Sequence, residues 1–324
     1  MKSIQVDRSW DGRRLTRFLQ KAMPSATMGQ IRRFLRLGRV KVDGRRADEE
    51  TVLRESAVVD MYVEDEFFAE AERADPFYSK IRPKLTILYE DDQVMLLSKR
   101  AGLVCHPDEG EKVHTLLTYA QAYLYQKGEW NPKMDFAPAL CNRIDRFTAG
   151  IVILAKTQEA LRAMDAKIRT HEVQKYYLCI VHGRMKYPEG TLRHWLTKKP
   201  EQKKVTVLHK NEPGSKEAVT YYQVIDERDG LTLCECLLGT GRTHQIRAQF
   251  AAIGHPLLGD NQYGQAKQNE KYGRMNGQAL CAYRLIFDFE DAPACLSGLD
   301  GLTVQVRDVP FVREYFPDVV IPAP

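Results

Sequence analysis

The sequence lacks a hydrophobic run long enough to cross a membrane. Its most apolar stretch, residues 150–155, is far shorter than the roughly 20 residues that a membrane-spanning helix needs. No apolar segment follows the first charged residues, so no secretory signal peptide is expected. The seven cysteines, scattered over 324 residues, do not form the pattern of a disulfide framework. We therefore expect a protein of the reducing cytoplasm, without a membrane segment.

The sequence also lacks the motifs of a bound cofactor or metal. Gly239-Thr240-Gly241 is too short for a dinucleotide-binding fingerprint and lacks the Lys-Ser/Thr pair of a phosphate-binding loop. Cys234 and Cys236 share one face of an expected strand, but no second pair follows at zinc-site spacing, so buried thiols are expected. Four histidines show no metal-ligand spacing: His106, His182, His244 and His255. No cofactor and no metal are expected.

Positive charge is concentrated near the N-terminal end. Residues 1–41 contain eleven Lys and Arg but only two acidic residues, whereas the whole chain has a net charge of +5. A basic module on a nearly neutral body favours a polyanionic partner, and nucleic acid is the usual one. A basic surface that is merely solvated is the alternative.

Residues 1–63 have the pattern of a small module with two helices and short strands. Apolar residues recur at helical spacing in two segments, the second of which Thr27 is expected to cap. A strand over residues 39–42 leads into the hairpin-turn pair Asp43-Gly44, and a second strand is expected around residues 58–63. The apolar faces of the two helices are expected to be Leu15, Phe18, Leu19 and Ala22 in the first and Ile31, Phe34 and Leu35 in the second.

The rest of the chain is expected to form a linker and a larger domain. Residues 64–84 are charge-rich and interrupted by two prolines, which is typical of a linker. From residue 85 onward, strand-like runs and helices follow one another without a regular βαβ rhythm. This pattern predicts an α+β domain rather than a doubly wound sheet.

A charged loop precedes the apolar strand expected over residues 151–155. In this loop Asp145 lies between Arg143 and Arg146, before a turn at Thr148-Ala149-Gly150. A carboxylate held by guanidinium groups stays ionised, so Asp145 is a candidate nucleophile or electrostatic stabiliser. The alternative is an ordinary salt-bridged carboxylate in a surface loop.

A strand is expected to follow the helix that Thr157 caps. One face of this strand would carry Tyr177, Cys179 and Val181, and the other Tyr176, Leu178 and Ile180. Either one tyrosine ring points into a cleft, or both rings are ordinary packing.

A later helix is expected to be capped by Thr243 and to bury Ile246, Phe250 and Ile253. Arg247 lies about 100° around the helix from Ile246, at the edge of the apolar face. Either Arg247 pairs inward with a carboxylate from another element, or it is a solvated helix residue.

Together these segments resemble the RluA family of RNA pseudouridine synthases. Residues 142–150 resemble the family's HRLD-x-x-TSG segment, Lys175-Tyr176-Tyr177 its K-x-Y strand, and residues 240–264 its TGRTHQIR…GHP…GD…YG segment. Residues 87–107 are similar to its upstream motif, and residues 1–63 resemble an S4 RNA-binding domain. The sequence departs from the family pattern at three positions, where His, Ser and Pro are replaced: Asn142, Ala149 and Arg100.

The resemblance implies the domains and the site residues. Residues 85–324 would have the pseudouridine synthase fold, with a mixed, largely antiparallel sheet flanked by helices. Asp145 would be the catalytic aspartate, Tyr177 would stack on the target base, and Arg247 would be the ion-pair partner of the aspartate. Substrate contacts would come from Arg143, Arg146, Thr148, Arg242, His244 and Gln245. RNA contacts of the S4-like module would come from Arg32, Arg33, Arg36 and Arg39.

The resemblance also implies a function: the isomerisation of a uridine to pseudouridine in structured RNA, with large-subunit ribosomal RNA favoured, by a monomer. This reaction breaks N1–C1′ and forms C5–C1′ without redox change, so one ionised carboxylate meets its needs. The carboxylate either attacks C1′ or removes a proton from C2′, and Tyr177 is a candidate base for the C5 proton. The uridine must be flipped out to reach such a site. A tRNA pseudouridine synthase and a non-catalytic RNA-binding or ribosome-assembly factor are the alternatives.

Overall fold

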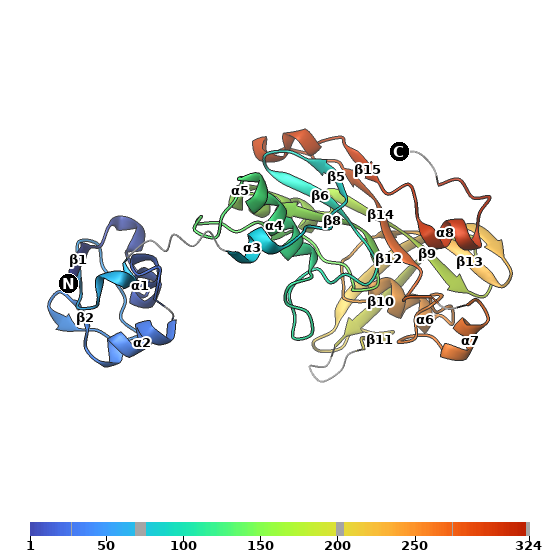
Figure 1. The fold of residues 1–324 in the computed structure, drawn as a ribbon. Coiled ribbons are helices and arrows are strands. Elements are labelled where there is room, and N and C mark those ends of the chain that lie inside the picture. The colour runs from blue at the N-terminus through green and yellow to red at the C-terminus, as the bar shows by residue number, and fades with distance from the viewer. Residues whose placement is uncertain (27, 69–75, 199–203, 274, 322–324) are drawn as a thin grey trace. The chain divides into compact units, whose positions relative to one another are not determined.

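The computed structural model of the chain describes residues 1–26, 28–68, 76–198, 204–273 and 275–321. The chain divides into two compact units, Met1–Pro76 and Phe77–Pro324, each with its own sheet and apolar core (Figure 1). The division falls inside the expected linker, residues 64–84. Both flanks of that segment are packed: Phe67 lies against the N-terminal core, and Ile81 is buried in the C-terminal unit.

The N-terminal unit has one apolar core shared by two helices and a four-stranded antiparallel sheet of order β1-β4-β2-β3. Six of the seven residues predicted for the apolar helix faces are buried, and Ala22, at the last position of α1, is partly buried against the same core. Asp43 and Gly44 both have positive φ, 49° and 74°, as a tight hairpin between β2 and β3 requires. Thr27, the expected cap, lies outside the described residues. The elements are β1 (Lys2–Gln5), η1 (Arg8–Trp10), α1 (Leu15–Ala22), α2 (Met28–Arg36), β2 (Val40–Val42), β3 (Arg45–Arg46), β4 (Val58–Met61) and η2 (Asp65–Phe67).

The C-terminal unit is built on a mixed, largely antiparallel sheet flanked by helices, as predicted. The strand order is β11-β10-β12-β13-β9-β14-β8-β6-β5, with β15 beside β14 and β7 beside β8. Among the named strands, β14 and β8 pair in parallel and the other neighbours are antiparallel. Within the described ranges, no helix is both long and apolar enough to cross a membrane.

The strands of this unit are β5 (Ile87–Glu90), β6 (Val94–Lys99), β7 (Ala139–Leu140), β8 (Ala149–Ala155), β9 (Val173–His182), β10 (Glu189–Thr197), β11 (Thr206–Leu208), β12 (Lys216–Arg228), β13 (Leu231–Leu238), β14 (Leu280–Phe287) and β15 (Thr303–Gln305). The helices are α3 (Pro76–Lys80), α4 (Leu116–Lys127), α5 (Gln158–Arg169), α6 (Gln245–Ala252), α7 (Ala266–Glu270), η3 (Ala294–Leu299) and α8 (Pro310–Tyr315).

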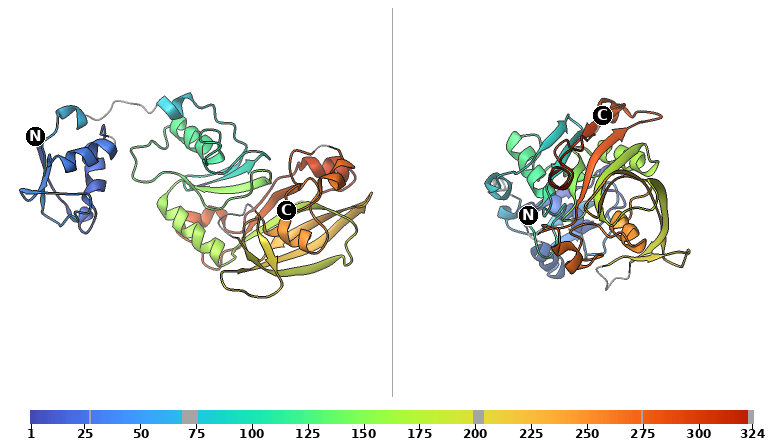
Figure 2. Two further views of the ribbon diagram at one scale, coloured as in Figure 1. Left: turned by 90° about the horizontal axis from the view of Figure 1, so that it is seen from below. Right: turned by 90° about the vertical axis from the view of Figure 1, so that its right-hand side faces the viewer.

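Strand β8, which follows the loop of Asp145, is apolar along its whole length because helices cover both of its faces (Figure 2, left). Ile151 and Ile153 pack in a core with α5, whereas Val152 and Leu154 pack in a core with α4. A strand buried on both faces has no reason to alternate polar and apolar residues. The β8 strand therefore gives the loop before it a rigid, fully buried support.

Strand β9 separates two further cores, as the sequence predicts. Its Tyr177, Cys179 and Val181 share a core with α6, and its Leu178 and Ile180 share a core with α8. The tyrosine ring of Tyr177 therefore lies on the same side of the sheet as α6.

Two details of α6 differ from the prediction. The residue at its N-cap is His244, with a left-handed φ of 53°, so Thr243 is not the cap. The reason is that the side-chain oxygen of Gln245 accepts a hydrogen bond from the Arg242 backbone N–H (3.0 Å) and closes the preceding turn. Ile253 is also 37% exposed, because the helix ends at Ala252 and its last large buried residue is Phe250.

Candidate active site

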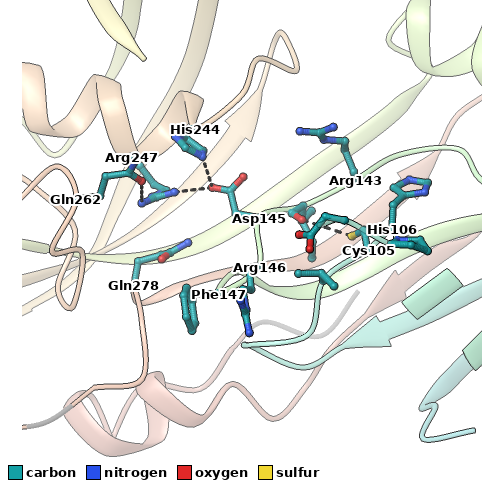
Figure 3. A pocket seen from close by; sticks show the side chains of 14 residues that line it. Cys105, His106, Arg143, Asp145, Arg146, Phe147, His244, Arg247, Gln262 and Gln278 are labelled. Atoms are coloured by element: carbon teal, nitrogen blue, oxygen red, sulfur yellow. Dashed lines mark hydrogen bonds and ion pairs between the residues drawn. The ribbon is translucent and has the colours of Figure 1, made fainter. Parts of the chain in front are cut away.

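Asp145 lies where three adjoining hollows of the C-terminal unit meet. The first, of about 450 Å³, is lined by the loop after β6, the loop before β8, the start of α6 and the segment after α6. The second is small and contains Tyr177. In Figure 3, Arg247 and His244 approach Asp145 from one side, whereas Arg143 and His106 lie on the other. We call the first two hollows together the Asp145 pocket.

The centre of the Asp145 pocket is an arginine shared by two carboxylates. The Nη1 atom of Arg247 donates to Oδ2 of Asp145 (2.9 Å). The Nε and Nη2 atoms donate to the two carboxylate oxygens of Asp260 (2.7 and 3.1 Å), and Nη2 also donates to Gln262 (2.8 Å). Of these two carboxylates, Asp260 is almost fully buried, whereas the side chain of Asp145 is 25% exposed. Arg247 therefore binds one oxygen of Asp145 and leaves the rest of the carboxylate open to the pocket.

The solvated alternative for Arg247 is wrong, because α6 is buried around most of its circumference. Arg247 is only 6% exposed, and Gln249 on the same helix is fully buried. The Gln249 amide binds the backbone of β10 and β12 at Leu192 (2.9 Å) and Ala218 (3.0 Å). Burial acts to lower the pKa of Arg247, but Asp260 and Asp145 more than offset it, so the guanidinium is charged.

His244 lies between Asp145 and Tyr263. Its Nδ1 is 2.8 Å from the Tyr263 hydroxyl, and its Nε2 is 3.8 Å from Oδ2 of Asp145. The hydroxyl of Tyr263 accepts a hydrogen bond from the Val205 N–H (2.8 Å), which leaves its own proton for Nδ1 of His244. Burial lowers the pKa of His244 even though the Asp145 charge acts in the opposite direction. At neutral pH His244 is therefore a neutral ring with its Nε2 side toward Asp145.

Tyr177 lines the second hollow together with Asp145 and Arg247. It is 7% exposed and shares a core with Ile246 and Phe250 of α6. Burial raises the pKa of Tyr177 well above its ordinary value, and the Asp145 charge adds to the effect. The phenol therefore keeps its proton at neutral pH.

The other residues expected to contact substrate also lie around Asp145, but with different freedom. Arg143 and Arg242 are exposed and line the hollows. Arg146 is exposed and donates to the Gly102 carbonyl (3.2 Å), whereas Thr148 is buried and accepts a hydrogen bond from Gln278 (3.0 Å).

Gln245 borders the second hollow, but its amide is satisfied within the protein. The oxygen accepts from the Thr240 hydroxyl (2.7 Å) and the Arg242 N–H, and the nitrogen donates to the Val219 carbonyl and the Thr220 hydroxyl (both 2.9 Å). This bonding makes Gln245 a brace for the turn before α6, and its role as a substrate ligand remains a prediction.

Sequence reasoning missed one residue that supports the loop of Asp145. Lys99, at the end of β6, is 1% exposed, and its ammonium donates to the carbonyls of Leu103 (2.7 Å), Arg146 (3.0 Å) and Arg100 (3.2 Å). Burial lowers the pKa of Lys99 from 10.5 to about 8. A lysine that ends an apolar strand normally indicates the surface, so only the resemblance of residues 87–107 could have pointed to it.

The four arginines expected to bind RNA belong to the N-terminal unit. All are exposed, and Arg32 pairs with Glu49 at 3.1 Å. Elsewhere, Cys179, Cys234 and Cys236 are buried in one core, where burial raises the pKa of Cys236. In the described parts of the chain, no group of three or more His, Cys, Asp or Glu side chains is arranged to hold a metal ion.

Comparison with known families matches both units. Residues 93–252 match the RNA pseudouridylate synthase family, and residues 13–59 match the S4 domain. An uncharacterised RNA pseudouridine synthase of Aquifex aeolicus is 32% identical over 258 residues, which cover 78% of this chain and 77% of the relative. The ribosomal large subunit pseudouridine synthase D of Xanthomonas campestris is 29% identical over 268 residues, or 82% and 76% of the two chains.

The fold agrees with these matches. The structure of human RNA pseudouridylate synthase domain containing 1 superposes with a TM-score of 0.54 at 19% identity, covering 72% of this chain and 86% of the human one. The chain belongs to the RNA pseudouridine synthase family and carries an S4 domain in its N-terminal unit.

Proposed function

We propose that this protein isomerises specific uridines of structured RNA, with Asp145 as the catalytic carboxylate. The observation that carries the proposal is the sharing of Arg247 between Asp145 and the buried Asp260. One guanidinium paired with two carboxylates leaves a net charge of −1. Asp145 is the more exposed of the two carboxylates, so this negative charge faces the pocket. A fixed anion at the mouth of a pocket is what the cleavage of a glycosidic bond without a metal requires.

The two oxygens of Asp145 have different surroundings. Oδ2 receives the hydrogen bond from Arg247 and faces His244, whereas Oδ1 has no hydrogen bond from the described residues. We assign Oδ1 as the oxygen that meets the ribose, either at C1′ or at the proton on C2′. In either case N1–C1′ breaks, the uracil turns over, C5–C1′ forms, and the C5 proton is lost while N1 gains one.

Tyr177 is assigned as the platform under the target base. Its ring borders the same hollow as Asp145, and its phenol keeps its proton at neutral pH. A protonated phenol favours stacking over proton abstraction. Stacking on an aromatic ring also offsets part of the cost of unstacking the uridine from its RNA.

Large-subunit ribosomal RNA is the proposed substrate class. The ribosomal large subunit pseudouridine synthases D of Nitrosomonas europaea and Xanthomonas campestris, at 33% and 29% identity, are named for that RNA. The S4 domain supplies a second, basic RNA-binding unit. The net positive charge of residues 1–41 supports the same role.

The test measures loss of the C5 hydrogen from uridine-labelled RNA by the full chain, with separate ribosomal and transfer RNA substrates lacking the modification. The wild-type protein should release label from large-subunit RNA, and Asp145→Asn should release none while binding the RNA with similar affinity. Glu159→Gln, a charge-removing change on α5, is the control and should retain activity.

Three results would contradict parts of the proposal. Activity in Asp145→Asn would remove Asp145 as the catalytic group. Activity on transfer RNA alone would replace the substrate class. Binding without release of label from either RNA would make the protein a binding or assembly factor.

A further inference from the structure

The third hollow at Asp145 is a groove with an unusual charge. It has a volume of about 640 Å³ and is continuous with the Asp145 pocket through Arg143, Asp145, Tyr177 and His244. Four cationic side chains line it. Among the described residues of its lining, the one acidic side chain is Asp145, which already pairs with Arg247. The four are Arg143, Arg169, Lys175 and Arg242. We call this hollow the flanking groove.

The cations of the flanking groove have no acidic partners in the described chain. Arg143, Arg169 and Lys175 form no ion pair or side-chain hydrogen bond with a described residue. Within the described chain, the side chain of Arg242 donates only to the Glu217 carbonyl (2.9 Å). Lys167, two residues before Arg169 on α5, does not line the groove and differs in this respect, because it pairs with Glu172 at 2.6 Å. Positive charge is therefore left uncompensated on the side that faces the groove.

Lys175 has the most informative position. It lies two residues before Tyr177 in β9, so the two side chains share a face of the strand and are about 7 Å apart along it. Lys175 is half-buried, and this burial lowers the pKa of its ammonium. A partly desolvated cation without an anion is costly to the folded protein, and an anion that enters the groove removes that cost.

Arg169 also lines the groove, at the last residue of α5. The negative end of the helix dipole lies here and would by itself repel an anion. Arg169 reverses the sign of this wall and, with Lys175 and Arg242, leaves a positive channel that begins beside the target base.

We propose that the flanking groove binds phosphate groups of the RNA strand next to the isomerised uridine, through Arg169, Lys175 and Arg242. This inference rests on the proposed function, because it takes the base at Tyr177 to be a uridine of an RNA chain. Phosphate contacts position a strand without reading its sequence. The groove therefore fixes the path of the RNA, and other contacts select the site.

The experiment compares RNA binding by matched variants of the full chain at several salt concentrations, with a fluorescent single-stranded oligouridylate as the probe. In Arg169→Gln/Lys175→Gln, affinity should fall and the slope of log affinity against log salt should flatten by about 1.4, or about 0.7 for each lost phosphate contact. The control, Arg162→Gln/Lys133→Gln, also removes two exposed cations that do not line the groove. Arg162 lies on the same side of α5 but about 10 Å further from the groove.

A second variant, Arg169→Lys/Lys175→Arg, keeps both charges and should keep the wild-type slope. Because Lys175→Gln removes a half-buried charge without a partner, its unfolding midpoint should not fall below that of the wild type. This measurement separates weak binding from misfolding.

The outcomes separate the two proposals. Equal slopes for the groove variant and its control, with pseudouridine still formed, would overturn the groove and leave the function standing. A flattened slope in a protein that forms no pseudouridine would support the groove as an RNA site and overturn the function.

Discussion

Lys99 provides the sharpest test of how the loop of Asp145 is held. Its buried ammonium joins the turn after β6 to the carbonyl of Arg146, the residue next to Asp145. Lys99→Met replaces it with an apolar side chain of similar length. Two of its three acceptors keep a backbone donor, since Arg146 O also binds Gly102 N (2.8 Å) and Arg100 O binds Leu103 N (3.4 Å). In the described chain only the Leu103 carbonyl loses its sole hydrogen bond.

The magnitudes nearly cancel for stability but not for activity. An unsatisfied Leu103 carbonyl costs about 1–3 kcal/mol. The depression of the Lys99 pKa from 10.5 to about 8 means that keeping the ammonium charged at neutral pH costs the fold about 3 kcal/mol. We therefore expect Lys99→Met to change the free energy of unfolding by less than about 2 kcal/mol at pH 7. The loosened loop should still lower the single-turnover rate about 100-fold, because catalysis is sensitive to small displacements of the reacting group.

The pH dependence has a definite sign. The folded protein releases the Lys99 proton near pH 8, whereas the unfolded chain holds it up to about pH 10.5. Between these values the unfolded state binds more protons, so the stability of the wild type relative to Lys99→Met rises with pH, by up to about 3 kcal/mol. Below about pH 8 the full cost of the buried charge is present.

Denaturant titrations of the wild type, Lys99→Met and Lys133→Met across this pH range measure the effect. The exposed Lys133 serves as the control for removal of a lysine charge. A flat difference for Lys99→Met would show that Lys99 is not a buried, charged amine. A wild-type single-turnover rate in Lys99→Met would show that its bond to Arg146 does not position Asp145.

Three further predictions concern Arg247, Gly150 and the arginines of α2. Arg247→Met should lower the free energy of unfolding by about 3–5 kcal/mol and abolish pseudouridine formation, because it leaves Asp260 buried without its cation. Arg247→Lys should restore stability in part but activity little, and wild-type activity in Arg247→Lys would contradict the bidentate role. Gly150→Ala should lower the free energy of unfolding by about 2–5 kcal/mol, because the added Cβ would lie 2.1 Å from the Ala282 carbonyl oxygen. Gly102→Ala, where the added Cβ meets no atom within 4 Å, should lower it by only about 1–2 kcal/mol. When Arg32, Arg33 and Arg36 of α2 are changed to Gln, the slope of log RNA affinity against log salt should flatten by about 2. The single-turnover rate in saturating RNA should be unchanged.

Patterns of local spacing predicted the frame of the site well. The faces of β9 and the buried side of the two N-terminal helices depend on periodicity alone, and the structure confirms both. The continuous apolar run of β8 likewise predicted a buried strand directly after the loop of Asp145. These features are set within one element, so a single sequence carries them.

Contacts between distant segments were not predictable in the same way. The spacing of Arg247 on α6 fits a solvated face, and its burial arises because β10, β12 and the segment after α6 close around the helix. Asp260 lies in a turn after α6, and the spacing of apolar residues does not predict the path of the chain there. The prediction of Thr243 as the cap of α6 was wrong for a similar reason. The side chain of Gln245 accepts a hydrogen bond from the Arg242 N–H and leaves Thr243 outside the helix.

The three departures from the family pattern fall on the frame of the site rather than on its charges. The side-chain oxygen of Asn142 accepts a hydrogen bond from the Ile153 N–H (2.8 Å), directly after the backbone bond from Cys141 N to Ile153 O. The amide thus substitutes for a strand carbonyl where β7 ends and lets the chain turn away toward Asp145. Ala149 lies in register with Cys281 of β14 and packs against the apolar core shared with α8, and Arg100 supplies a carbonyl to Lys99. Because none of these positions touches the carboxylate of Asp145, the pair with Arg247 is preserved while the loop around it is built from different side chains.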